Sequence, residues 1–202
     1  MQTASQLSQP SLSPTHFSTE SQNKQILLHL LSTAKSFNPL SWAIDLQPRS
    51  PAPDDIINRT HIASAHRAAV CIYLSRMLLS LYPHVQLSHD LESLVEDIMM
   101  PLSFILSDTE MFKAIAWPAF VAGAETRDPK RREWVKGKFH DLWEVQPWGV
   151  IRGALKVLEE IWERSKSRKP VLDLEGDIVN NERSGGDWIA ELRVTGVDWL
   201  II

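Results

Sequence analysis

The sequence predicts an all-α protein, an irregular bundle of about seven helices that follows a disordered N-terminal tail. Two observations lead to this fold class. From residue 60 onward, apolar residues recur three and four positions apart, the spacing of one face of an α-helix, and no stretch alternates convincingly like a strand. Five of the eight tryptophans lie between Trp117 and Trp162. Because buried aromatic side chains contribute large apolar areas, this stretch predicts a packed helical core.

The composition is that of an ordinary soluble domain, with 44% hydrophobic and 23% charged residues among 202. The formal net charge of -4 argues against the basic surface that general nucleic-acid binding requires. The single cysteine, Cys71, excludes an intramolecular disulfide and a multi-cysteine zinc site. No signal peptide is visible. Ser75, Arg76 and Ser80 interrupt the longest apolar run, so we expect no membrane span.

The first part of the chain is expected to carry little regular structure. Residues 1–20 are rich in Ser, Thr, Gln and Pro and cannot bury enough apolar surface to offset their ordering entropy, which predicts a disordered tail. Residues 21–59 are expected to hold one short helix, Gln25 to Leu31, and a proline-rich connection from residue 38. Within that connection, three alternating apolar residues are expected to dock at most as an extended segment: Trp42, Ile44 and Leu46.

Residues 60–202 form the predicted helical domain. Its longest helix, residues 60–81, is apolar almost all round over 68–81, which predicts a central position with neighbours on several sides. The next helix, residues 88–106, should kink or end at Pro101. Residues 107–110 have the spacing of a capping box, and Pro118 predicts a bend in the helix that follows. Small residues in that helix permit another helix to approach closely: Ala116, Ala119, Ala122 and Gly123.

Three more helices complete the domain. Asp128-Pro129 combines a good N-cap with a proline in the first turn and predicts a helix over 129–144. A second helix, 149–165, follows Pro147-Trp148-Gly149, and Asp187 should cap a last one that ends near Gly196. Trp143 and Trp162 lie on the apolar stripes of their helices and are expected in the core.

One segment resembles a metal-binding motif. Asp54-Asp55-Ile56-Ile57-Asn58 is similar to the aspartate-rich motif of terpene cyclases, in which carboxylates hold magnesium ions. Here it follows a proline-rich loop, the second metal motif of that family is absent, and the chain is short. An acidic helix N-terminus or loop is therefore the favoured interpretation of Asp54 and Asp55.

For the other polar residues that could form a functional site, structural roles are the favoured interpretation. His61 and His66 lack the spacing of a helical zinc site, and Cys71 in an apolar helix behaves as a small hydrophobe. Two basic clusters, Lys130-Arg131-Arg132 and Arg164–Lys169, could contact phosphates or act as nuclear import signals, but solvated helix ends are favoured. We assign no catalytic, cofactor-binding or metal-binding residue.

Several tryptophan-centred pieces occur in an order that resembles the C-terminal half of the fungal-specific transcription factor domain, over roughly residues 60–202. They are Ala116-Trp117-Pro118 with Ala122-Gly123 and Glu125, Leu142-Trp143-Glu144-Val145 with Pro147-Trp148-Gly149, Val157 to Trp162, Asp187-Trp188, and Asp198-Trp199-Leu200. That domain is the regulatory region of fungal zinc-cluster activators, whose six-cysteine module binds DNA. With one cysteine, this chain lacks that module, and no site residue of the family transfers to it.

The resemblance implies a nuclear regulatory or interaction domain that is not an enzyme and has no cofactor. It would act through other proteins, in a homo- or hetero-oligomer, or as a truncated regulator. It also implies that the first half of the regulatory domain is missing, which would explain the long connection and leave the helix at 68–81 exposed, at Val70, Leu74, Leu78 and Leu81. Two alternatives remain. One is a small helical enzyme or ligand-binding protein that uses Asp54 and Asp55, and the other is a helical adaptor outside transcription.

Overall fold

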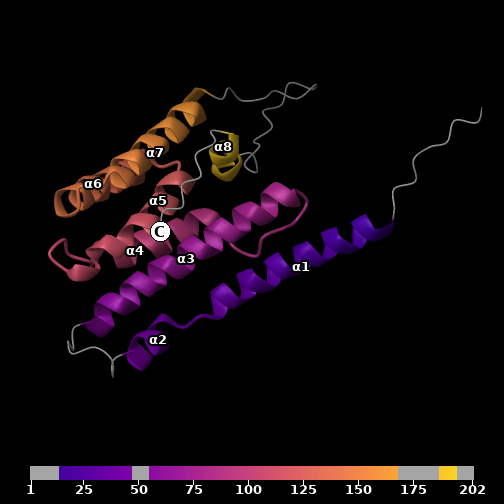
Figure 1. Ribbon diagram of the computed structural model, residues 1–202, viewed down its shortest axis with the longest axis horizontal. Coiled ribbons are helices and arrows are strands. Elements are labelled where there is room, and N and C mark those ends of the chain that lie inside the picture. The colour runs from indigo at the N-terminus through magenta and orange to yellow at the C-terminus, as the bar shows by residue number, and fades with distance from the viewer. Residues whose placement is uncertain (1–13, 47–54, 168–186, 195–202) are drawn as a thin grey trace, which may run out of the picture.

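A computed structural model describes residues 14–46, 55–167 and 187–194, and all regular structure in these ranges is helical (Figure 1). The all-α prediction is confirmed. The elements, in chain order, are α1 (Pro14–Ser36), α2 (Pro39–Leu46), α3 (Asp55–Leu81), α4 (Leu91–Ser103), the 3₁₀ helix η2 (Glu110–Ile115), α5 (Ala116–Glu125), α6 (Pro129–Val145), α7 (Gly149–Ser167) and α8 (Trp188–Val194).

The long helix α3 is the centre of the bundle, as its sequence predicts. It contacts α1, α2, α4, η2, α5 and α8. Its inward residues are completely or almost completely buried: Ala65, Ala68, Ala69, Ile72 and Leu78. The helix begins at Asp55, five residues before the predicted start at Thr60. Because neighbours lie on several sides, the nearly all-round apolar pattern of this helix is satisfied within the fold.

The N-terminal region is more regular than its composition predicts. Helix α1 begins at Pro14, so the expected disordered tail, 1–20, is helical from residue 14, while residues 1–13 lie outside the described ranges. Trp42, Ile44 and Leu46 belong to α2 and are not extended. The physical reason is an N-terminal cap: the Asn38 side chain accepts a hydrogen bond from the backbone N–H of Ser41 at 3.0 Å, and Pro39 is the first residue of the helix.

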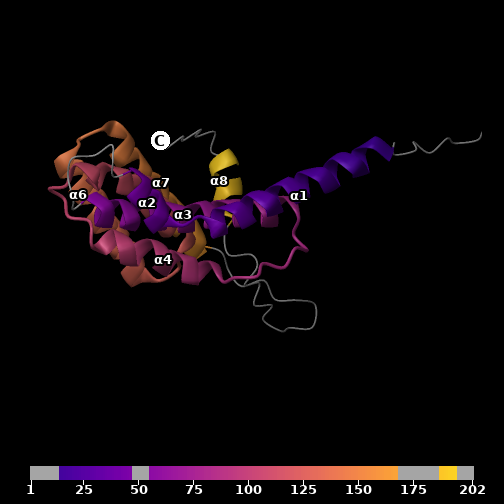
Figure 2. The same cartoon turned by 90° about the horizontal axis from the view of Figure 1, so that it is seen from below.

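Helix α1 supplies a neighbour that residues 68–81 were expected to lack, and Tyr82, just after α3, donates to the carbonyl oxygen of Glu20 in α1. Together with α2, which lies beside the N-terminal part of α3, it forms one outer layer of the bundle (Figures 1 and 2). Leu78 is buried, Val70 and Leu74 are partly buried, and of these four residues only Leu81 is strongly exposed. The expectation that this helix exposes its apolar side is therefore wrong for most of its residues.

Helices α3 and α4 form a helical hairpin, and the segment that follows α4 differs from expectation. Asp90 caps α4, because its carboxylate accepts a hydrogen bond from the backbone N–H of Ser93 at 2.8 Å. The helix ends at Ser103, two residues after the buried Pro101, as predicted. The capping box expected at 107–110 does not form: Thr109 precedes η2 without a side-chain cap, and its hydroxyl donates to the carbonyl of Leu106 at 2.8 Å.

Helix α5 joins the two layers of the bundle. Every residue from Pro118 to Glu125 is buried, between α3 and α4 on one side and α6 and α7 on the other. Pro118 lies in the first turn of α5 and not in the middle of a helix, so it does not produce the predicted bend. The helical segment instead changes from 3₁₀ to α-helix at Ala116. A Cβ atom at Gly123 would lie 2.9 Å from Val135 Cγ1, which confirms that a small residue is needed for close approach.

The last three helices begin where the sequence predicts. Asp128 accepts a hydrogen bond from the N–H of Lys130 and Pro129 opens α6, while Asp187 accepts one from the N–H of Ala190 at the start of α8. Trp162 is buried, and its indole N–H donates to the carbonyl oxygen of Gly123 at 2.8 Å. Trp143 is only partly buried at the edge of the core, so its predicted core position is wrong.

Candidate functional site

The structure does not test the metal motif predicted from Asp54 and Asp55. Asp54 lies outside the described residues, and Asp55 is the first residue of α3, with a side chain that is not described. Within the described ranges, no three His, Cys, Asp or Glu side chains come together in a way that could hold a metal ion. In the same ranges, none of the helices combines the length and the apolar character needed to cross a bilayer.

The histidines of α3 and the single cysteine each have a structural environment. His61 stacks on Phe104 with ring centroids 4.9 Å apart. His66 Nε2 lies 2.9 Å from the carbonyl oxygen of Ala114, and burial lowers the pKa of His66. The thiol of Cys71 is buried, and this burial raises its pKa, which disfavours the reactive thiolate. These contacts join α3 to its neighbours and bring no reactive groups together.

His89 lies in a hydrogen-bonded chain that superficially resembles a catalytic relay. Its Nε2 is 3.0 Å from the hydroxyl oxygen of Ser75, and its Nδ1 is 2.7 Å from the ammonium of Lys35. An ammonium group can only donate, so Nδ1 must accept and the proton must sit on Nε2, which then donates to Ser75. A base that activates serine needs the opposite arrangement.

The chain of bonds through His89 therefore fastens α1 to the body of the protein. Lys35 near the end of α1 also donates to the hydroxyl of Ser88 at 3.0 Å, while Ser75 on α3 is completely buried. Burial and the positive charge of Lys35 lower the pKa of His89, which favours the neutral ring that this arrangement requires.

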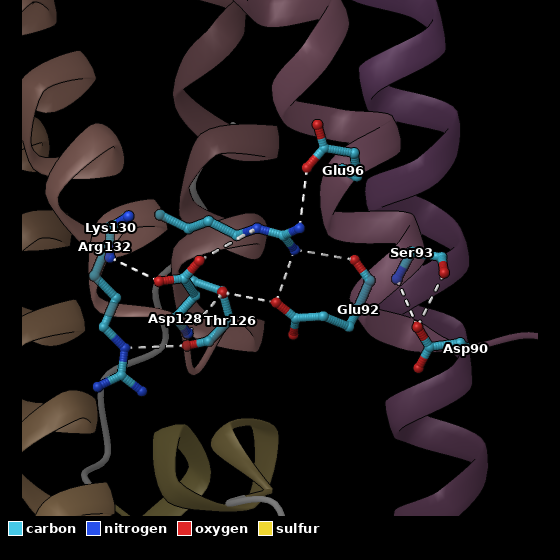
Figure 3. A network of polar contacts seen from close by, with 9 residues as sticks. Asp90, Glu92, Ser93, Glu96, Thr126, Asp128, Lys130 and Arg132 are labelled. Atoms are coloured by element: carbon cyan, nitrogen blue, oxygen red, sulfur yellow. Dashed lines mark hydrogen bonds and ion pairs between the residues drawn. The ribbon is translucent and has the colours of Figure 1, made fainter.

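Two residues of the basic cluster Lys130-Arg131-Arg132, Arg131 and Arg132, bind other parts of the protein, whereas Lys130 is exposed (Figure 3). Arg131 contacts carboxylate oxygens of Glu92 at 2.8 Å, Glu96 at 3.1 Å and Asp128 at 3.9 Å. Its charge is thus opposed by three carboxylates from α4 and from the cap of α6. The expected solvated helix end is only partly correct, because Arg131 connects α6 to α4.

Thr126 extends this network to the end of α5 (Figure 3). Its hydroxyl donates to Glu92 Oε1 at 3.0 Å and accepts from the N–H of Asp128 at 3.2 Å, and its carbonyl accepts from Arg132 Nε at 3.1 Å. Arg132 also lies over the ring of Trp162. The other basic cluster behaves as predicted where it is described: Arg164 and Lys166 pair with exposed glutamates of their own helix, Glu160 and Glu163.

A second polar group, buried in the core, was not predicted. Arg76 on α3 makes two hydrogen bonds to the carboxylate of Glu125 at the end of α5, one of them at 2.8 Å, and the indole of Trp188 donates to the same carboxylate at 3.1 Å. Burial disfavours the guanidinium charge, but Glu125 outweighs this and raises the pKa of Arg76. Part of the signal was present in the sequence: Arg76 is a lone charge within an apolar run and Glu125 directly follows one, and charged residues are almost never fully buried unless they are paired.

Several large apolar side chains are exposed on the described helices. Helices α1 and α2, with the turn between them, expose seven large hydrophobic side chains, each between 38% and 51% accessible: Ile26, Leu28, Leu30, Phe37, Leu40, Trp42 and Ile44. Three other large apolar side chains are exposed, Ile57 near the start of α3, Met100 in the last turns of α4, and Phe104, which stacks on His61. Apolar exposure on this scale is typical of surfaces that bind proteins.

Comparison with known proteins gives one family and one relative with a curated name. Residues 2–200 match the model of the family described as the fungal specific transcription factor domain. The chain is also 32% identical over 180 residues to the acriflavine sensitivity control protein acr-2 of Neurospora crassa, a match that covers 86% of this chain and 28% of the relative. The chain thus spans less than a third of that relative. No solved structure matches. The family match reaches much further toward the N-terminus than the resemblance over 60–202, and it includes α1 and α2.

Proposed function

Because the chain belongs to the fungal-specific transcription factor domain family, we propose that it is a nuclear regulatory domain that controls transcription through contacts with other proteins. The observation that carries the proposal is the family match over nearly the whole chain, together with the apolar side chains exposed on α1 and α2. Large exposed apolar surfaces favour protein contacts.

We further propose that this chain does not recognise specific DNA by itself. One cysteine among 202 residues cannot supply a six-cysteine zinc cluster, and the formal net charge is -4. At the basic start of α6, Lys130-Arg131-Arg132, the guanidinium of Arg131 pairs with Glu92, Glu96 and Asp128. DNA recognition would then come from outside these 202 residues, in the same polypeptide or in a partner.

We also propose that the chain has no enzymatic activity. The reactive side chains in the described ranges are arranged for stability: His89 presents its donor side to Ser75, and the thiol of Cys71 is buried. The runner-up, a helical enzyme or ligand-binding protein that uses Asp54 and Asp55, predicts that magnesium changes the tryptophan fluorescence and that Asp54→Asn with Asp55→Asn abolishes the change. We expect no response below millimolar magnesium.

A tethered reporter experiment tests the regulatory proposal. The chain is fused to an unrelated DNA-binding domain and expressed in a yeast with a reporter gene that carries the matching sites. We expect the fusion to be nuclear and to raise or lower reporter output several-fold relative to the DNA-binding domain alone. A fusion with Phe139→Asp, which places a charge in the core, controls for folding, since Phe139 is 1% exposed. A stable, nuclear fusion that changes the output in neither direction would contradict the proposal.

A further inference from the structure

We propose that the buried site of the Trp188 indole recognises Asp-Trp-aliphatic segments, and that a second such segment of this chain, Asp198-Trp199-Leu200, binds there in exchange for α8. The inference goes beyond the proposed function, because it concerns two alternative occupants of one site within the chain. The site, here called the indole socket, is formed by two residues of α3 and two of α5: Tyr73, Arg76, Phe120 and Glu125.

The indole socket provides both kinds of contact that a buried indole requires. Trp188 is 2% exposed, and its ring centroid lies 6.3 Å from that of Tyr73 and 6.3 Å from that of Phe120, which it meets edge to face. Its indole N–H donates to Glu125 Oε2 at 3.1 Å. A buried indole needs such an acceptor, and a carboxylate is a strong one. Because phenylalanine and aliphatic side chains have no N–H to donate, the socket favours tryptophan.

The charges of the socket are balanced without α8. Arg76 donates to both oxygens of the Glu125 carboxylate, with Arg76 Nε 2.8 Å from Oε2. When Trp188 leaves, each of the two buried charges therefore keeps its ion-pair partner. Helices α3 and α5 also pack directly against each other, so the socket residues retain their support. One indole can thus be exchanged for another.

Helix α8 is attached to the bundle through few side chains. It has seven residues, and among those whose side chains are described only Trp188 and Ile189 are buried. In Figure 2 the helix lies at the edge of the bundle. A helix of this length is not stable alone in water. Because short peripheral elements open at a lower free energy than the whole protein unfolds, α8 can leave while the rest of the bundle stays folded.

A second segment has the same pattern as the one that fills the socket. Gly185-Gly186-Asp187-Trp188-Ile189 and Gly196-Val197-Asp198-Trp199-Leu200 share glycine, any residue, aspartate, tryptophan and a branched aliphatic residue, in that order. The chain contains these two Asp-Trp pairs and no others. Leu200 corresponds to Ile189, which is 4% exposed beside the socket. Residues 195–202 lie outside the described ranges, and the sequence assigns them a second occupant for the socket.

The aspartate of the pattern has a defined role where it is described. Asp187 Oδ1 accepts from the N–H of Ala190 at 3.1 Å, and the Asp187 carbonyl oxygen accepts from the N–H of Glu191 at 2.9 Å. Burial opposes the charge of Arg76, but Glu125 and, to a lesser extent, Asp187 raise its pKa. Ile201 and Ile202 stand at the same separations from Asp198. The second segment can therefore form the same two backbone hydrogen bonds and bring the same charge toward Arg76.

The connection to α7 allows either tryptophan to reach the socket. Helix α7 ends at Ser167, and Trp199 is only somewhat further along the chain than Trp188. The entropic cost of closing a loop increases with the logarithm of its length, so the longer connection is only slightly less favourable. The α8 segment adds contacts of the partly buried Leu192 with the core, which makes it the major occupant. Loss of the Trp188 indole should transfer the socket to Trp199.

Nuclear magnetic resonance of the full chain with isotope-labelled indoles tests the inference. In Trp188→Ala we expect the indole N–H of Trp199 to exchange with solvent at least about tenfold more slowly than in the wild type, because it becomes buried against Glu125. Trp148→Ala is the matched control, since it removes a tryptophan that is 61% exposed and should leave exchange at Trp199 unchanged. Exchange at Trp199 that is equally fast in Trp188→Ala and in the wild type would overturn the inference.

Urea denaturation gives a second readout. Trp188→Ala and Trp199→Ala are measured alone and together. Because Trp199 replaces the missing indole in Trp188→Ala, the double variant should lose more stability than the sum of the two single losses. Additive losses would contradict the exchange. If Trp188→Ala does not fold, Trp188→Phe keeps a ring in the socket and removes only the donor. It should also slow exchange at Trp199, and no slowing there would equally refute the proposal.

Discussion

Arg76 and Glu125 form an ion pair inside the bundle, with side chains 11% and 4% exposed. The pair joins the central helix α3 to the end of α5, and Trp188 of α8 donates to the same carboxylate. Three elements that are far apart in the sequence thus meet at one buried charge. Removal of one residue would leave the other charge buried without its ion-pair partner.

We expect Arg76→Met or Glu125→Leu alone to lower the free energy of unfolding by about 3–5 kcal/mol. The double variant should recover a substantial part of this loss, because neither charge then remains buried. Urea denaturation of the four proteins gives the coupling energy. Additive losses in the double variant would show that the two residues do not stabilise each other.

Trp162 and Trp143 should differ in their contribution to stability. Trp162 is 4% exposed and donates to Gly123, so Trp162→Ala should cost about 3–5 kcal/mol. Trp143 lies at the edge of the core with the Arg152 guanidinium 3.6 Å from its ring centroid, and Trp143→Ala should cost about 1–2 kcal/mol. Chemical denaturation checks the ranking, and equal losses would contradict the assignment of Trp143 to the edge.

Replacement by alanine should change stability in opposite directions at Gly123 of α5 and Gly137 of α6. A Cβ at Gly123 would press on Val135 at 2.9 Å and on Leu158 at 3.1 Å, so Gly123→Ala should destabilise by about 1–3 kcal/mol through overpacking. No atom lies within 4 Å of a Cβ at Gly137, within α6, and Gly137→Ala should stabilise by about 0.5–1 kcal/mol. Thermal unfolding of both variants provides the comparison. If Gly123→Ala is neutral or stabilising, α5 does not approach α6 and α7 as closely as described.

Mild acid should destabilise the fold through His66 and His89. Burial lowers the pKa of both, and the charge of Lys35 lowers that of His89 further, although Asp90 opposes this. The unfolded chain therefore takes up protons near pH 6.5, where the folded histidines are still neutral. The stability that the two neutral histidines contribute is fully present above that pH. It is lost as the pH falls toward the lowered pKa values of His66 and His89 in the folded state.

Urea denaturation at several values between pH 7.5 and 5 measures this effect. The variant His66→Gln with His89→Gln keeps hydrogen-bonding groups at both positions but cannot titrate, and it should show a flatter dependence of stability on pH than the wild type. A wild-type stability that rises as the pH falls from 7 to 5.5 would contradict the assignment.

Specific DNA binding by the isolated chain is not expected. Affinity for any duplex should stay at the non-specific level, about 10⁻⁴–10⁻⁶ M at physiological salt, and should weaken steeply as salt increases. Fluorescence anisotropy with a set of duplexes checks this. Submicromolar binding to one sequence, with weaker binding to a scrambled control, would contradict it.

The features that were predictable from the sequence are those encoded within a few residues. Asp128-Pro129 and Asp187 mark the starts of α6 and α8 because a side chain caps the backbone of its own segment. Asn38-Pro39 marks the start of α2 by the same rule, because the Asn38 side chain caps the backbone of its own segment. The order of the tryptophan-centred pieces along the sequence was likewise enough to indicate the family.

Contacts between residues of different helices could be identified only from the tertiary structure. Nothing local distinguishes Leu31, which packs on α3, from Leu30, which faces outward, because both suit an apolar helix and only the position of α3 decides which one is buried. The meeting of Arg76 with Glu125 depends in the same way on how α3 and α5 cross. Helix starts follow from bonds between neighbours in sequence, whereas burial and the free surface of α1 follow from which elements share a core.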